Sequence, residues 1–106
     1  MEKLKELIQE VLTSFNESGV PGGSLYDLFY ELESVYDLEK EMGPDFDYQA
    51  YFRALRKKPI EELSCMEVVT YFSDIMYGER FCTGYIWYHV ENGIMERLIK
   101  RLNDLV

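Results

Sequence analysis

The sequence predicts an all-α protein, folded as a compact bundle of five to six helices in a single domain that spans residues 1–106. Apolar residues recur at the spacing of an α-helix along most of the chain. No alternation of apolar and polar residues, which would be typical of a β-strand, extends beyond four positions. Glycine and proline separate the helical patterns, and a hydrophobic content of 47% is enough for one buried core.

The first helix is predicted over residues 2–17, where charged residues lie opposite one apolar face. The apolar face consists of Leu4, Leu7, Ile8, Val11, Leu12 and Phe15. The segment 18–23 contains three glycines and a proline, so it is expected to end the helix as a loop.

A second helix is predicted from Ser24 to the Gly43-Pro44 pair, which would stop it. Ser24 is the expected N-cap residue, with Asp27 as its partner three positions later. The residues expected to face the core are Leu25, Leu28, Phe29, Leu32 and Val35 or Tyr36.

Two shorter helices are predicted in the middle of the chain. Asp45 or Asp47 is expected to cap the first of them, which ends before Pro59 and has an apolar face of Tyr48, Tyr51, Phe52 and Leu55. The sequence from Ser64 to Glu67 is a capping box, and it opens a helix that ends at Gly78. The core face of that helix is Cys65, Val68, Val69, Phe72, Ile75 and Met76.

Two further helical patterns meet at Asn92-Gly93 in the last quarter of the chain. Gly93 is suited to the left-handed conformation that ends a helix, so the two helices are expected to form a pair turned at this point. The first pattern is Phe81, Cys82, Tyr85, Ile86, His89 and Val90, and the second is Ile94, Met95, Leu98, Ile99, Leu102 and Leu105.

This last quarter also carries a resemblance. The run Glu79-Arg80-Phe81-Cys82-Thr83-Gly84, followed by Asn92-Gly93, Arg97-Leu98 and Arg101-Leu102, resembles the C-terminal signature of an uncharacterised bacterial domain family. Phe46-Asp47-Tyr48 and the segment from Thr70 to Arg80 fit the looser upstream pattern of that family. The resemblance covers roughly residues 25–105. It implies a fold but no site, because no activity is assigned to the family.

The charge of the chain is acidic and uneven. The net charge is −9, and residues 27–47 hold eight acids against Lys40 alone, a local net charge of −7. The basic residues Arg53, Arg56, Lys57 and Lys58 follow as one cluster. Such a balance opposes direct binding to nucleic acid or to an anionic membrane and favours a basic protein partner. No apolar run approaches the ~20 residues of a membrane span, and the charged N-terminus is unlike a signal peptide, so the expected location is the cytoplasm.

A polar and aromatic stripe flanks the core face of the second predicted helix. It consists of Tyr26, Tyr30, Glu33, Asp37 and Glu41. Acids four positions apart repel each other, and each pair costs a few tenths of a kcal/mol, so the stripe indicates a use other than stability. The predicted partner-binding residues are Tyr26, Tyr30, Glu31, Glu33, Asp37, Glu41, Asp45 and Asp47.

Few residues are candidates for chemistry. Cys65, Cys82 and His89 are the candidate metal ligands, and Glu91 or an outside ligand could complete a site. The sequence has no short Cys-x-x-Cys pair and no clear fourth ligand, so no metal and no cofactor are expected. The cysteines are instead expected in the core, with His89 at its edge. Arg80 either binds an anion or forms an ion pair with a carboxylate elsewhere in the fold, and the ion pair is the expected role. Trp87 lies opposite the apolar face of its helix. Either a second helix covers it, approaching at Gly84, or it is an exposed anchor for a partner, and we expect the second helix.

Two functions follow from these patterns. In the first, the protein is not an enzyme and its acidic, tyrosine-bearing face binds the basic surface of a nuclease or another nucleic-acid-handling enzyme. In composition it looks like the small acidic phage inhibitors that mimic DNA, such as anti-CRISPR proteins. In the second, it is a housekeeping bacterial domain that binds a small anion or metal near Arg80, Cys82 and His89. A pocket that joins those three residues would favour the second function.

Overall fold

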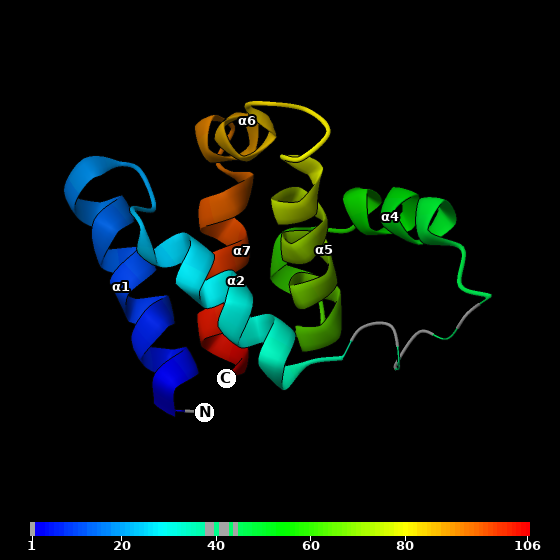
Figure 1. The fold of residues 1–106 in the computed structure, drawn as a ribbon, viewed down its shortest axis with the longest axis horizontal. Coiled ribbons are helices and arrows are strands. Elements are labelled where there is room, and N and C mark those ends of the chain that lie inside the picture. Colours follow the sequence, from blue (N-terminus) through cyan, green and yellow to red (C-terminus); the bar gives the residue numbers. More distant parts are fainter. Residues whose placement is uncertain (1, 38–39, 41–42, 44) are drawn as a thin grey trace.

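A computed structural model describes residues 2–37, 40, 43 and 45–106, and it confirms the all-α class (Figure 1). The described residues form six α-helices and one short 3-10 helix, η1, and none of them is in a strand. The elements in chain order are α1 (Glu2–Ser18), α2 (Ser24–Val35), α4 (Tyr48–Lys57), η1 (Ile60–Glu62), α5 (Cys65–Gly78), α6 (Tyr85–Glu91) and α7 (Ile94–Leu105).

The C-terminal helix α7 organises the bundle, because it packs against α1, α5, α6 and η1. Helix α2 closes the bundle by packing against both α1 and α5. Figure 1 shows α6 across one end of α5 and α7, and α4 at the side of the molecule farthest from α1. Among the described helices, α4 makes its main contacts with α5 alone. One side of α4, near α2 and α5, therefore faces solvent.

The core contains most of the residues on the predicted apolar faces. Its fully buried helical side chains come from α1, α2, α4, α5 and α7, and each contributes about 1.5–3 kcal/mol of hydrophobic free energy on burial. Among the largest are Leu4, Ile8, Leu28, Leu32, Leu55, Phe72, Ile75, Met95, Leu98 and Leu102. The Tyr48 side chain, which the sequence places on the face of α4, lies outside the described part of the chain.

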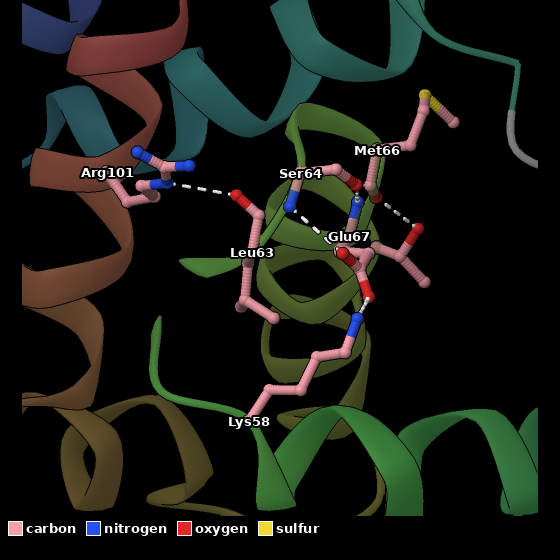
Figure 2. Close-up of polar contacts among 7 residues, drawn as sticks. Lys58, Leu63, Ser64, Met66, Glu67 and Arg101 are labelled. Carbon is pink, nitrogen blue, oxygen red and sulfur yellow. Dashed lines mark hydrogen bonds and ion pairs between the residues drawn. The ribbon is translucent and has the colours of Figure 1, made fainter. Parts of the chain in front are cut away.

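The predicted capping box is present at the start of α5, and Figure 2 shows its contacts. Glu67 N donates to Ser64 Oγ at 3.2 Å, and Ser64 N donates to Glu67 Oε1 at 3.0 Å. Lys58 Nζ donates to the other oxygen of Glu67 at 2.8 Å, and Arg101 Nε donates to the carbonyl of Leu63 at 2.9 Å. These bonds tie the start of α5 to the end of α4 and to α7.

The start of α2 differs from the prediction. Gly23, not Ser24, is the N-cap residue, and its position has no side-chain cap. Ser24 is already helical, and its Oγ donates to Glu10 Oε2 on α1 at 3.0 Å. The serine therefore joins two helices in place of capping one, and Asp27 has no capping partner.

The end of α2 also differs, because the helix stops at Val35 and does not continue to Gly43. Tyr36 leaves the helix in an extended conformation with φ −118° and ψ 117°. In this conformation its ring packs against the core, and its hydroxyl shares a 3.3 Å hydrogen bond with Cys65 Sγ. Val35 is exposed as a result. Asp47 is the residue that caps α4, since its Oδ1 accepts from Ala50 N at 3.1 Å.

The largest difference lies in residues 79–84, which form a turn where the sequence predicts helix. The Glu79 carboxylate folds over this turn and accepts from Gly84 N at 2.8 Å and from Ile86 N at 2.9 Å. Gly84 has φ +90°, and α6 starts only at Tyr85. Phe81 and Cys82 consequently leave the predicted apolar face and are exposed. The predicted turn between α6 and α7 is confirmed, because Gly93 has φ +82°.

Candidate partner-binding surface

Two grooves border the exposed side of α2, where it meets α5. The first, which we call the tyrosine groove, has a volume of about 470 Å³. Its α2 wall includes Tyr26, Tyr30 and Glu33, and its α5 side includes Met76 and Tyr77, with Arg80 at its edge. The Tyr30 side chain is 63% exposed, although burying a large aromatic ring is favourable. Three of the predicted partner-binding residues therefore line one concave surface.

The second, which we call the acidic groove, lies where α2, α4 and α5 meet, and it has a volume of about 530 Å³. Among the described residues, three carboxylates line it: Glu33 and Asp37 from α2 and the segment after it, and Asp74 from α5. Aromatic side chains form much of the remaining wall, namely Tyr36, Phe52 and Tyr77. The groove thus combines negative charge with aromatic faces.

Glu33 and Tyr77 line both grooves and separate one from the other. Tyr77 Oη donates to Glu33 Oε2 at 2.8 Å. The Tyr77 ring stands edge-on against Phe29, with 5.1 Å between the ring centroids. This contact holds the boundary between the grooves in place, so the two are fixed relative to each other.

Asp74 has an electrostatic environment unlike that of the other two acids. Burial raises the pKa of its carboxyl above the ordinary value of 3.8, and electrostatic interactions with Arg56 and His89 oppose that shift only in part. Arg56 Nη2 lies 3.6 Å from Asp74 Oδ2, which is longer than a good hydrogen bond. Asp74 therefore carries a charge that neither water nor Arg56 fully stabilises.

The other predicted partner-binding residues that the structure describes do not line these grooves. Glu31 points to α1, where Lys3 Nζ lies 3.6 Å from its carboxylate. Asp47 serves as the cap of α4. Asp45 is exposed in the turn before that cap, and Glu41 lies outside the described residues. The predicted stripe along one continuous helix is thus interrupted after Glu33, because α2 ends at Val35.

Arg80, Cys82 and His89 do not share a pocket in the structure. Arg80 lines the tyrosine groove, with its guanidinium carbon 6.0 Å from the centre of the Tyr77 ring, and no described carboxylate pairs with it. Cys82 is exposed in the turn, whereas His89 is buried with its Nδ1 2.8 Å from the carbonyl oxygen of Tyr85. Cys65 is half-buried beside Tyr36. Within the described residues, no three histidine, cysteine or acidic side chains are grouped so that they could hold a metal ion.

The expected covering of Trp87 by a second helix is wrong. Trp87 is 52% exposed, and its neighbour Tyr88 is exposed as well. Helix α6 is short because it begins only at Tyr85, and its buried side consists of Tyr85, Ile86, His89 and Val90. Trp87 lies on the opposite side of this short helix. No described atom lies within 4 Å of a Cβ placed at Gly84, so none of the described helices makes the close approach expected there.

Sequence reasoning missed the α5 side of both grooves, which includes Ser73, Asp74 and Tyr77. One signal was present in the sequence. Asp74 is an acid between Phe72 and Ile75, in a helix whose residues from Val68 to Met76 are otherwise all buried. A charge in such a position indicates either an internal ion pair or a site.

Comparisons with protein-family models, with curated proteins and with solved structures returned no match. The resemblance to a bacterial domain family therefore stays a prediction. In the structure, Glu79 and Gly84, two residues of the run that carries the resemblance, together form the turn before α6. Within the described residues, no helix is both long enough and apolar enough to cross a membrane.

Proposed function

We propose that this protein is a non-enzymatic binding domain whose α2 face attaches to a basic protein surface. The observation that carries the proposal is the exposure of Tyr26 and Tyr30 beside Glu33 on one hollowed surface. Tyrosine is enriched in interfaces because its ring supplies contact area while its hydroxyl tolerates water. Acids around such rings steer a positively charged partner toward them.

The partner class follows from charge. A net charge of −9 would repel nucleic acids, but it would attract proteins whose surfaces are shaped to bind phosphates. We therefore propose a nuclease or another nucleic-acid-handling enzyme as the partner. In that role the protein would act as an inhibitor that occupies the nucleic-acid site, in the manner of the phage proteins that mimic DNA. A cytoplasmic location is part of the same proposal.

The test is affinity capture from cell lysate with matched variants. One variant carries Glu33→Lys and Asp37→Lys, and its control carries Glu6→Lys and Glu17→Lys on α1, where both side chains are exposed. Both variants change the net charge equally. We expect the first variant to lose a partner that the control retains, since only the first alters the α2 face.

Two further measurements examine the mechanism. Tyr30→Ala should speed dissociation of the captured partner, by the equivalent of about 1–3 kcal/mol for an interface anchor. Added double-stranded DNA should compete with the protein for that partner, while the protein alone should not retard DNA at ~150 mM salt. Equal capture by all variants, or capture that DNA does not reduce, would contradict the proposed function.

A further inference from the structure

The acidic groove has features that the binding of a flat basic surface does not require. It is hollowed to about 530 Å³, which is in the range of clefts that enclose a small ligand or a single side chain. Three described carboxylates line it, and the only described cation paired with any of them is Arg56, next to Asp74. The groove therefore keeps an excess of negative charge inside a concave wall.

A second observation, independent of the acids, also indicates a ligand. The Ser73 side chain is only 4% exposed and lines the groove, and no described group forms a hydrogen bond with its hydroxyl. No fully enclosed side-chain oxygen or nitrogen lacks a partner among the described residues. The Ser73 hydroxyl must therefore reach the groove surface, where it is available to a ligand.

We propose that the acidic groove binds one arginine side chain of the basic partner protein, a proposal that rests on the function proposed above. A guanidinium group fits this lining better than an ammonium group, because it stacks flat on aromatic faces such as those of Tyr36, Phe52 and Tyr77. Its five N–H donors can reach two acceptors at once, and Asp74 and Ser73 are adjacent acceptors on α5. Glu33 and Asp37 add attraction at the rim.

The probe for this proposal is a pair of capped pentapeptides, Gly-Gly-Arg-Gly-Gly and Gly-Gly-Lys-Gly-Gly, titrated into the ¹⁵N-labelled full chain by NMR. We expect the arginine peptide to shift the amide resonances of Ser73, Asp74 and Tyr77 in a saturable way, and the lysine peptide to bind more weakly. Asp74→Asn should weaken the arginine peptide roughly tenfold, which is the loss expected for one charge-assisted hydrogen bond.

The matched controls separate a built site from general attraction. Glu6→Gln removes the same charge from exposed α1 and should leave the arginine peptide bound as in the wild type. Asp37→Asn alters an exposed residue of the groove, so it should weaken the peptide even if Asp74→Asn disturbs folding. Equal binding of both peptides, or equal weakening by Glu6→Gln and Asp74→Asn, would overturn the proposal.

The captured partner distinguishes this proposal from the proposed function. If Tyr30→Ala weakens the partner and Asp74→Asn does not, the α2 face binds but the groove holds no arginine. If neither change affects the partner, the proposed function itself fails. If both weaken it, the groove takes part in the interface.

Discussion

The Tyr77 hydroxyl donates to Glu33 Oε2 at 2.8 Å, and this bond joins α5 to α2 between two grooves. The residues are 44 positions apart in the chain, and both are exposed. The bond therefore connects the two walls of the candidate binding surface at its rim and leaves the core untouched.

We expect the bond between Tyr77 and Glu33 to contribute little to folding. Tyr77→Phe keeps the edge-on contact with Phe29 and removes only the donor. A double-mutant cycle of Tyr77→Phe and Glu33→Gln, measured by urea unfolding, should give a coupling energy of about 0.5 kcal/mol, at the low end for a hydrogen bond because water replaces it readily. A coupling above ~2 kcal/mol would show that the bond supports the fold.

Asp74→Asn should raise the free energy of unfolding at pH 7. Burial raises the pKa of the Asp74 carboxyl, so the folded state binds its proton more tightly than the unfolded state does. The charged form thus destabilises the fold above the raised pKa, and this penalty disappears as the pH falls below 3.8. Thermal melts of wild type and variant from pH 7 to pH 3 should converge at the acid end. A variant less stable than wild type at pH 7 would show that the Arg56 ion pair outweighs the cost of burial.

Glu79→Gln should loosen α6 without unfolding the bundle. The backbone bonds from Ile86 and Gly84 to the Glu79 carboxylate lower its pKa. Because the folded pKa is depressed, its stabilisation is present above the ordinary value of 4.5 and is lost as the pH falls through the lowered value. Hydrogen exchange at neutral pH should be faster at Gly84 and Ile86 in the variant. Glu91→Gln, at the other end of α6, is the control and should leave those two amides unchanged.

Gly78→Ala should destabilise the fold, whereas Gly23→Ala should not. A Cβ at Gly78 would overlap the Tyr85 ring, while a Cβ at Gly23 would meet nothing within 4 Å. The first change should cost about 1–3 kcal/mol, as overpacking does, and the second should lie within ~0.5 kcal/mol of wild type. Urea unfolding measures both. Equal stability of the two variants would mean that Tyr85 can move away at no cost.

We expect the serine at the start of α5 to contribute more to the free energy of unfolding than the serine at the start of α2. Ser64→Ala removes the side-chain acceptor of a complete capping box, and it should cost about 1 kcal/mol. Ser24→Ala removes only an exposed bond to Glu10, so it should change the free energy of unfolding by less than ~0.5 kcal/mol. Chemical denaturation of both variants tests the assignment, and the reverse order of the two costs would contradict it.

The sequence by itself determined the class and the core. Leu4, Leu28, Phe72 and Leu98 are buried as their spacing predicts, because helical periodicity is a local property that packing then uses. The capping box at Ser64 and the left-handed Gly93 are equally local, since each depends on residues within one turn. On the candidate surface, the exposure of Tyr26 and Tyr30 was predictable for the same reason.

Only the tertiary structure decided where a helix ends early and where a predicted cap or helical turn is replaced by a contact with another part of the chain. Tyr36 leaves α2 because Cys65 and the core lie beside it, 29 positions away, and this break removes Asp37 from the predicted stripe. Ser24 bonds to α1 in place of capping α2, and Glu79 closes a turn that exposes Phe81. The acidic groove combines Glu33 and Asp37 with Asp74, and no local pattern contains that combination. Periodicity reports which face of a helix is apolar, but the neighbour that meets the other face is set by the packing of the whole chain.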